Sequence, residues 1–273
     1  MPVMRNKIFT LLESERPKID RRETLKFILS CIDLTTLNGS DTETTITDLC
    51  QKALSFEDKT KDIPSVAAVC IYSPFVELAK QQLAGSNIQV AVAAGGFPSG
   101  QTQIHIKLLE IAHAIDAGAD EIDTVISRGK FLEGKYKKVS EEIAAIKEMC
   151  GKVHLKVILE TGELQTLDNI RKASEIAIQS GADFIKTSTG KITPAATPEA
   201  SWVMMETIAE YYRKTGIQIG FKPAGGITEP DQAIDYYILL RHILGEKWIN
   251  KNLFRIGASR LADKILSELL SEL

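Results

Sequence analysis

The chain alternates short runs of apolar and β-branched residues with longer segments of helical pattern, almost from end to end. Eight β-then-α units of this kind are typical of a parallel barrel that carries its helices on the outside. We expect strands at Ser30–Leu34, Val66–Ile71, Gln89–Ala94, Glu121–Ile126, Leu155–Glu160, Phe184–Lys186, Ile219–Pro223 and Leu253–Ile256.

Helices are expected after each strand, and several of them have recognisable ends. Pro198 and Pro230 suit first-turn positions, where the missing N–H of proline costs nothing. Ser140 can cap a helix, while Gly118 and Gly181 suit the positions just after a helix ends. The predicted helices are Thr42–Ala53, Pro74–Ala84, Thr102–Ala117, Ser140–Cys150, Leu167–Ser180, Pro198–Thr215, Pro230–Leu244 and Ser259–Leu270.

The whole chain, residues 1–273, is expected to form one α/β domain, a (β/α)₈ TIM barrel. Residues 1–29 would be an N-terminal helical extension that adds a helix before the first strand. The length suits one large domain, and no Pro/Gly/Ser-rich linker divides it. An open, doubly wound sheet is the structural alternative. That fold favours a G-x-G-x-x-G turn after the first strand, and the segment Asp33–Asn38 does not have this pattern.

Composition excludes several classes of function. The net charge of −3 provides no basic field for nucleic acid. No apolar run reaches the length of a membrane span, and the N-terminus lacks a secretory apolar region. The four cysteines have no C-x-x-C spacing, which favours reduced thiols in a cytoplasmic protein. The four histidines form no pattern that is typical of a zinc site.

Three lysines lie in, or at the ends of, consecutive predicted strands: Lys156, Lys186 and Lys222. Parallel barrels carry their catalytic groups at the C-terminal ends of the strands. A lysine at the end of a buried strand meets a low dielectric, which disfavours the ammonium form and makes the amine available as a nucleophile toward a carbonyl. Lys222, on the strand next to that of Lys186, would supply a second cation that favours the neutral amine.

Each of these lysines has another interpretation when it is taken alone. Lys156 could point outward between barrel and helices or pair with an acid, Lys222 could clamp a phosphate, and Lys186 could be a lysine of the rim. Their recurrence at one place favours a shared site. In the strand 121–126, either Glu121 or Asp123 faces inward, and an acid beside the lysines could transfer protons through a water. A solvated turn is the alternative for Asp123.

Glycine-rich loops suggest a site for a phosphate. Gly225-Gly226 follows the seventh predicted strand, and Gly257-Ala258-Ser259 follows the eighth. The loops after these two strands often form the phosphate site of such barrels. Glycines let backbone N–H groups approach an anion, and Ser259 would begin a helix whose dipole favours it. The hydroxyl, glycine and lysine of Thr189-Gly190-Lys191 also suit an anion.

Four stretches together resemble deoxyribose-phosphate aldolase. They are the segment Cys31–Asn38, the segment Lys156–Thr161, the segment Gly181–Lys191 around Lys186, and the segment Gly220–Gly226. The resemblance covers nearly the whole chain and implies a class I aldolase on a (β/α)₈ barrel. Such an enzyme reversibly cleaves 2-deoxy-D-ribose 5-phosphate to acetaldehyde and D-glyceraldehyde 3-phosphate through a Schiff base. No metal or other cofactor is implied, because the iminium supplies the electrophilic charge.

Matched motif by motif, the resemblance also implies the roles of individual residues. It implies Lys186 as the Schiff-base lysine, Lys222 as its perturbing cation and Asp123 as the proton-transfer acid, with Asp33 and Lys156 in support. It implies Thr189, Gly190, Lys191, Gly225, Gly226, Gly257 and Ser259 as substrate and phosphate contacts. Cys70, at the C-terminal end of the second predicted strand, is a further supporting candidate by its position. Arg260 stands where some family members have a second serine, and could supply charge instead. The sequence also ends without the tyrosine tail of some members.

The expected partners are small molecules, a sugar phosphate and aldehydes, and neither nucleic acid nor a membrane. Another class I Schiff-base sugar-phosphate aldolase or a transaldolase is the close alternative function. A non-catalytic sugar-phosphate-binding barrel is the alternative from a different class. Family members are often dimers, which makes a homodimer one expectation. Trp248 or Tyr236-Tyr237 could serve its interface, and packing between helices is the alternative for both.

Overall fold

The computed structural model describes residues 2–56 and 62–271. Its strands are β1 (Ile32–Thr35), β2 (Ala68–Tyr72), β3 (Gln89–Ala94), β4 (Glu121–Val125), β5 (His154–Ile158), β6 (Phe184–Lys186), β7 (Gly220–Lys222) and β8 (Ile256–Ala258). Within the described residues these strands form one parallel sheet in the order β7-β6-β5-β4-β3-β2-β1-β8. The bridges Phe221–Phe254 and Ala224–Gly257 join its two ends. The predicted barrel is therefore confirmed.

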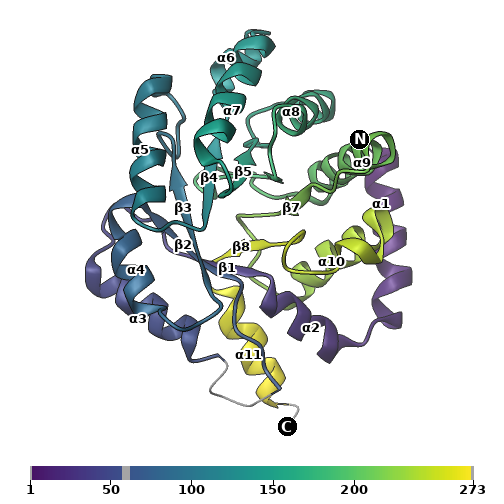
Figure 1. Ribbon diagram of the computed structural model, residues 1–273. Helices are drawn as coiled ribbons and strands as arrows, with labels where there is room; N and C mark the ends of the chain where they lie inside the picture. The colour runs from purple at the N-terminus through teal and green to yellow at the C-terminus, as the bar shows by residue number, and fades with distance from the viewer. Residues whose placement is uncertain (1, 57–61, 272–273) are drawn as a thin grey trace.

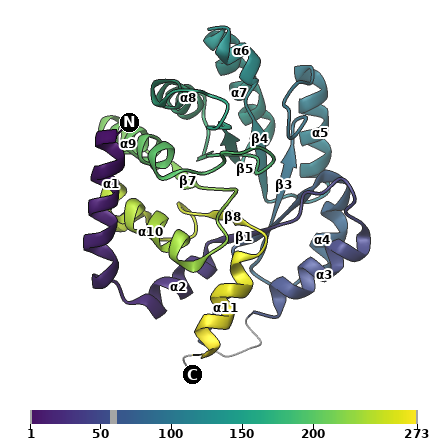
Figure 2. The ribbon, with the colours of Figure 1, turned by 180° about the vertical axis from the view of Figure 1, so that it is seen from behind.

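Helices surround the barrel on all sides (Figures 1 and 2). They are α3 (Glu43–Leu54), α4 (Val76–Gln82), α5 (Ile104–Asp116), α6 (Arg128–Leu132), α7 (Tyr136–Cys150), α8 (Leu167–Gln179), α9 (Pro198–Thr215), α10 (Pro230–Leu244) and α11 (Leu261–Ser271). Pro198 and Pro230 occupy first turns, as expected. Gly118 and Gly181 follow α5 and α8 with φ of 102° and 96°, values that favour glycine. No helix in the described ranges combines the length and apolar character that crossing a bilayer requires.

The N-terminal stretch forms two helices rather than one. They are α1 (Pro2–Glu15) and α2 (Arg21–Ser30), joined by the 3₁₀ turn η1 (Arg16–Lys18). Asp20 accepts a hydrogen bond from the backbone N–H of Glu23 at 3.1 Å and so caps α2. Arg16 pairs with Asp235 of α10 at 2.7 Å, and α1 lies beside α9 and α10 (Figure 1). The extra helix expected before the first strand is present and packs on the barrel's outer layer.

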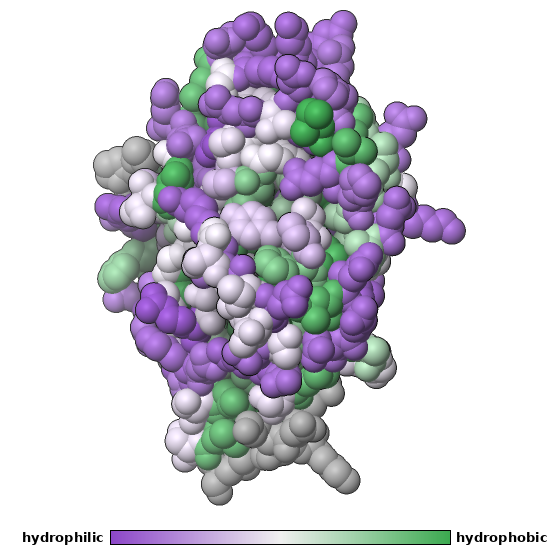
Figure 3. Space-filling model, turned by 90° about the vertical axis from the view of Figure 1, so that its left-hand side faces the viewer, coloured by the Kyte–Doolittle hydropathy of each residue, from purple (hydrophilic) through white to green (hydrophobic). Residues whose placement is uncertain are grey.

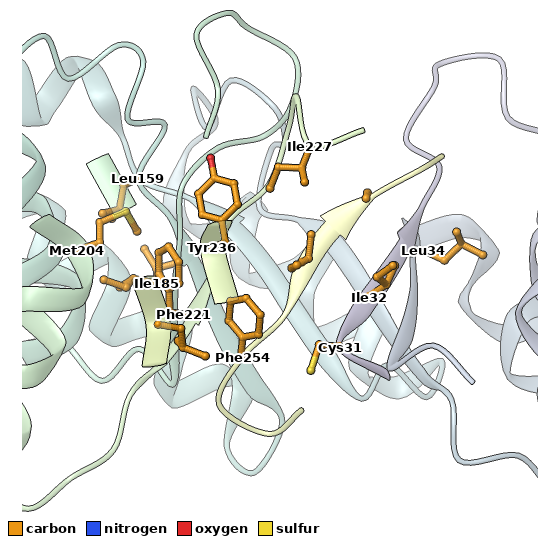
Figure 4. Packing of buried hydrophobic residues seen from close by; sticks show 14 of the residues in the cluster. Cys31, Ile32, Leu34, Leu159, Ile185, Met204, Phe221, Ile227, Tyr236 and Phe254 are labelled. Atoms are coloured by element: carbon orange, nitrogen blue, oxygen red, sulfur yellow. The ribbon is translucent and has the colours of Figure 1, made fainter. Parts of the chain in front are cut away.

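The apolar core lies between the strands and the helices. Outward-facing Ile185 of β6 and Phe221 of β7 pack there with Met204 of α9 and Tyr236 of α10 (Figure 4). The rings of Phe221 and Phe254 stack with their centroids 6.5 Å apart. Since strand side chains alternate between two faces, this layer leaves the inward-facing side chains free to form a site.

The aromatic residues considered for a dimer interface pack inside the protein. Trp248 is 2% exposed, and its indole N–H donates to the carbonyl of Ile219 at 2.8 Å. Tyr236 is buried, and Tyr237 packs against Phe27 with ring centroids 5.6 Å apart. Packing between elements therefore accounts for these residues. The side that carries α3, α4 and α5 is mainly hydrophilic, with small separate groups of hydrophobic residues (Figure 3).

The eighth strand begins later than the sequence predicts. The backbone N–H groups of Leu253 and Phe254 bond to the carbonyl of Asn250 in a turn, so the strand starts at Ile256 instead of Leu253. As a result Gly257 lies inside β8 and not in the loop that follows it. The pattern failed here because apolar residues that pack toward β7 look the same as strand residues that pair with β1.

The helix predicted at Ser140 begins one turn earlier, at Tyr136. The ring of Tyr136 packs on Phe131 of α6, with centroids 5.1 Å apart, and no periodic pattern in the sequence predicted that short helix. Ser140 therefore lies inside α7, where its hydroxyl is 2.8 Å from that of Ser180. It caps no helix.

Candidate active site

The inner wall of the barrel has an apolar side formed by small residues of β2 and β3. Ala68 and Cys70 of β2 pack there with Ala91 and Ala93 of β3. Cys70 belongs to this apolar wall, and burial raises the pKa of its thiol. Small side chains on this side leave space for long charged side chains from the other strands.

Asp123 of β4 lies at the centre of those charged side chains. The ammonium groups of Lys186 and Lys222 both donate to its Oδ2 at 2.7 Å, and Lys156 donates to Oδ1 at 2.9 Å. Asp123 and both supporting lysines, Lys156 and Lys222, are fully buried, while Lys186 is 3% exposed. The structure thus brings together the three lysines and the acid that the sequence singled out, and places them at adjacent strands.

A second tier of charge lies beneath Asp123. Asp33 of β1 accepts hydrogen bonds from Lys222 and from Nη1 of Arg255, the latter at 2.8 Å. Arg255 also forms a bidentate pair with Glu121, in which Nη2 donates to Oε1 at 2.8 Å and Nη1 donates to Oε2 at 3.0 Å. Glu121 accepts from Lys156 at 2.6 Å. Both acids of β4 therefore face inward, whereas the sequence had left the choice between them open.

The ion pairs keep these groups charged despite their burial. Burial alone would raise the pKa of Asp123, but the ammonium groups of Lys156, Lys186 and Lys222 hold it well below its usual range. Burial alone would lower the pKa of Lys222, but the carboxylates of Asp123 and Asp33 raise it above the ordinary value. Burial would also lower the pKa of Lys156, but the carboxylates of Asp123 and Glu121 raise it above the ordinary value.

The cluster carries one more positive than negative charge when all of its members are ionised. Its carboxylates are Asp33, Glu121 and Asp123, and its cations are Lys156, Lys186, Lys222 and Arg255. Within the described chain, Lys156 and Lys222 each pair with at least two carboxylates. Lys186 pairs there with one carboxylate oxygen, which it shares with Lys222. Lys186 is therefore the cation with the least anionic support.

A cavity of about 380 Å³ opens above the cluster, at the C-terminal ends of the strands. Of the charged cluster, Lys186 lines it; the rest of the lining comes from the C-terminal ends of β1 and β8 and from the loops after β1, β6, β7 and β8. The lining includes every residue predicted to contact substrate or phosphate: Thr189, Gly190, Lys191, Gly225, Gly226, Gly257 and Ser259. Arg260 also lines it, with an exposed side chain. Lys191 donates to the carbonyl of Leu37, which joins the loops after β6 and β1.

The turn after β7 is held tightly against the loop after β6. Ser188 and Thr187 donate their hydroxyls to the carbonyl of Ala224 at 2.5 and 3.2 Å. Gly225 has φ of 83°, and a Cβ on it would lie 2.6 Å from that of Ala195, so the close approach requires glycine. Within the described residues, the N–H groups of Gly225 and Gly226 donate no hydrogen bond and remain available to an anion.

Two predictions about the loop after β8 need correction. The N–H of Gly257 already donates to the carbonyl of Pro223 at 3.0 Å, so this glycine offers no donor to an anion. It provides space instead, because a Cβ there would lie 2.9 Å from Ala224 Cβ and 3.4 Å from Lys222 Cε. Ser259 does not begin the helix, since α11 starts at Leu261. Its exposed side chain nevertheless lines the cavity.

Two buried charged residues of the site region were missed by the sequence analysis as functional groups. Arg255 is 3% exposed and Glu160 is fully buried. A charged residue inside the apolar run Leu253–Ile256 was the available signal for Arg255. Glu160 was placed at the C-terminal end of the predicted strand Leu155–Glu160, where such barrels carry catalytic groups, but it was given no role.

A scan of protein families matches residues 27–235 of this chain, more than half of its length, to the model described as DeoC/LacD family aldolase. The chain belongs to this aldolase family. The resemblance inferred from the four motifs is thereby confirmed.

Curated relatives and a solved structure agree with this assignment. The human deoxyribose-phosphate aldolase is 46% identical over 86% of this chain and 77% of its own length. The bovine deoxyribose-phosphate aldolase is 45% identical over 85% and 76%. The structure of deoxyribose phosphate aldolase from Aeropyrum pernix matches with a TM-score of 0.68, covering 93% of this chain and 98% of its own. At 24% identity, that last likeness supports the barrel fold alone.

Proposed function

We propose that this site carries out the reversible aldol cleavage of 2-deoxy-D-ribose 5-phosphate to acetaldehyde and D-glyceraldehyde 3-phosphate. The single observation that carries the proposal is the placement of Lys186. Its amine reaches the cavity, and its only carboxylate contact among the described residues is an oxygen shared with Lys222. The relatives named above as deoxyribose-phosphate aldolases support this choice of reaction within the family.

Lys186 is proposed as the nucleophile because of the charge balance around it. Three carboxylates can neutralise three of the four cations of the cluster, and the guanidinium of Arg255 stays charged. Lys156 and Lys222 are each held by at least two carboxylates. Lys186, which contacts one carboxylate oxygen that it shares with Lys222, is left as the cation with the weakest anionic contacts. Its amine lines the cavity and is therefore the one placed to attack a carbonyl there.

Asp123 is proposed as the proton-transfer group. Its Oδ2 is 2.7 Å from the Lys186 nitrogen, which is within the range for direct proton exchange. Three lysines hold the pKa of Asp123 low in spite of its burial. Its carboxylate is therefore ionised, and can accept a proton, at neutral pH. Lys222 and Lys156 hold both of its oxygens in place.

The phosphate is proposed to bind at the far end of the cavity. The N–H groups of Gly225 and Gly226 are available there, and the side chains of Ser259 and Arg260 line the same space. A phosphate suits a concave group of backbone N–H donors with a cation close by. Arg260 would supply that charge in place of the second serine found in some family members.

The steps follow from these positions. The Lys186 amine adds to the C1 aldehyde of the open-chain sugar, and the carbinolamine loses water to give an iminium. The C2–C3 bond then breaks as the C3 hydroxyl loses its proton, and the electron pair of that bond moves into the iminium to form an enamine. D-Glyceraldehyde 3-phosphate leaves. The enamine takes a proton at the former C2, and water hydrolyses the imine to acetaldehyde and the free amine.

Turnover of 2-deoxyribose 5-phosphate by lysine variants tests the proposal. Lys186→Leu should abolish cleavage, with a loss of at least about 10⁴-fold in kcat, because the covalent route is removed. Lys214→Leu, on the exposed end of α9, is the matched control and should retain full activity. Cleavage of a ketose phosphate in preference to 2-deoxyribose 5-phosphate would point to a different class I aldolase. Undiminished cleavage by Lys186→Leu would overturn the proposed nucleophile.

A further inference from the structure

A buried carboxylate lies outside the lysine cluster, directly after β5. Glu160 is fully buried, and its φ of 57° is a left-handed conformation that non-glycine residues rarely adopt. Such a conformation costs on the order of 1 kcal/mol and persists only where the surroundings hold the residue in place. The backbone hydrogen bonds around Glu160 and the contacts of its side chain together hold this conformation in place.

The contacts of Glu160 join it to the loop after β6. Its Oε1 accepts from the backbone N–H of Thr189 at 3.2 Å, and its Oε2 accepts the Thr189 hydroxyl. Nη1 of Arg128 lies 3.3 Å from Oε2 and balances the buried charge. Arg128 in turn donates to the carbonyl of Ser99 at 2.9 Å. One carboxylate thus connects the loops after β3, β4, β5 and β6.

The loop that Glu160 holds is the one that faces the candidate phosphate turn. Gly190 follows Thr189, and a Cβ on Gly225 would come within 3.1 Å of the Gly190 Cα. A shift of Thr189 would therefore move the backbone that supports the free N–H groups of Gly225 and Gly226. Lys186 is fixed separately, by its place in β6 and its bond to Asp123.

We propose that Glu160 is a positioning residue for the phosphate end of the substrate, acting through Thr189 and Gly190 on the turn after β7. This inference rests on the proposed function, since it takes that turn as the phosphate site. Glu160 does not line the cavity and touches no reacting atom, so its effect is on binding of the phosphate and not on Schiff-base formation.

The test compares Glu160→Gln with wild type on two substrates, 2-deoxyribose 5-phosphate and unphosphorylated 2-deoxyribose. Loss of the charged hydrogen bonds to Thr189 should raise KM for the phosphorylated sugar roughly tenfold. It should change kcat/KM for the unphosphorylated sugar less than about twofold. Reductive trapping of acetaldehyde on Lys186 should be unchanged. Glu163→Gln is the matched control. Glu163 pairs with the same Arg128 at 2.8 Å, but its side chain is 43% exposed. Its replacement should leave KM and kcat for both sugars unchanged.

A second variant covers the case in which Glu160→Gln does not fold. Thr189→Val removes the hydroxyl that donates to Glu160 and should give the same phosphate-selective rise in KM. Equal losses on both sugars, or no loss on either, would overturn the positioning role. Failure of wild-type protein to form any acetaldehyde adduct would instead overturn the proposed function, whatever Glu160→Gln does.

Discussion

Three carboxylates and four cations lie buried together inside the barrel, so the charge of each side chain depends on its neighbours. Asp123 connects them, because each of its oxygens accepts from at least one lysine. Lys186 differs from Lys156 and Lys222 in reaching the cavity and in having the weaker anionic support. The same residue is thus the most accessible amine of the cluster and the one with the fewest carboxylate contacts among the described residues.

Removal of Lys222 should make Lys186 less reactive. In Lys222→Leu, Asp123 Oδ2 accepts a hydrogen bond from Lys186 alone, so the carboxylate holds the Lys186 nitrogen more strongly and away from a carbonyl in the cavity. Trapping of acetaldehyde by borohydride at pH 7 should fall by roughly tenfold or more, the effect of about 1.4 kcal/mol of added attraction. The trapping rate checks this, with Lys214→Leu as a control. A wild-type trapping rate in Lys222→Leu would contradict it.

Removal of Arg255 should destabilise the fold more than a surface arginine would. Arg255→Met removes the guanidinium that pairs with the buried carboxylates of Glu121 and Asp33. Removing one partner of a buried ion pair lowers the free energy of unfolding by about 3–5 kcal/mol. Arg255→Lys keeps the positive charge but not the two parallel hydrogen bonds to Glu121, so its loss of stability should be smaller. Urea unfolding at pH 7 measures the free energies of unfolding. Equal stability of Arg255→Met and wild type would show that the guanidinium contributes nothing.

Single residues of the site could be predicted where the strand pattern exposed them. Lys156, Lys186 and Lys222 were recognisable because lysines are rare at the ends of buried strands. The partners of Arg255 and the left-handed backbone of Glu160 were not, because both depend on contacts between elements distant in the chain: Arg255 reaches Asp33 and Glu121, and Glu160 reaches Thr189.

At the scale of elements, the loops after β6 and β7 form one unit. Thr187 and Ser188 hold Ala224, and the glycines of the two loops lie against each other. The lysines at the ends of β6 and β7 are adjacent in register, Lys186 with Lys222. The proposed Schiff-base lysine and the proposed phosphate turn are therefore held by the same pair of strand ends.

Two neighbouring glycines of the turn after β7 should respond differently to alanine. At Gly225, with φ of 83°, a Cβ would lie 2.6 Å from Ala195 Cβ and 2.9 Å from Ser188 Oγ. At Gly226, with φ of 80°, the space is open. Gly226→Ala should cost about 1–2 kcal/mol of backbone strain, and Gly225→Ala should cost more and also raise KM for the phosphorylated sugar. Thermal unfolding with kinetics checks both, and equal effects would contradict the crowding at Gly225.

The sequence predicted which strands and main helices occur, but it predicted their first and last residues less well. The eight strands were all located because apolar runs bounded by glycine and polar residues recur regularly. The predicted start of β8 was wrong because pairing with β1 begins only at Ile256. That pairing depends on contacts with a distant strand, which a local sequence pattern does not contain. The start of α7 was wrong because Tyr136 packs on a short helix, α6, whose five residues carry little periodicity.

At the scale of the molecule, the apolar layer between strands and helices supports a charged interior. Figure 4 shows the apolar layer, with the aromatic and aliphatic side chains directed between sheet and helices. The stability of the whole fold must then depend on pH, since the carboxylates inside the barrel are ionised in the folded state and solvated when the chain unfolds.

The free energy of unfolding should fall in acid. The pKa values of Asp33, Glu121 and Asp123 are each depressed in the folded protein, where lysines and Arg255 outweigh the effect of burial. Their contribution is full above the unfolded pKa values of about 4 and is lost as pH falls through the lower folded values. Urea unfolding between pH 7 and pH 3 should show little change from these groups above about pH 5 and a steep decline below. Stability that stays constant or rises down to pH 3 would contradict this.

The identity of the lysine that forms the Schiff base is open to direct measurement. Wild-type protein incubated with acetaldehyde and borohydride, then digested and analysed by mass spectrometry, should carry one added ethyl group on the peptide that contains Lys186. Lys186→Leu should carry none. An ethyl group on Lys156 or Lys222 in place of Lys186, or an unmodified wild-type protein, would contradict the assignment of Lys186 as the nucleophile.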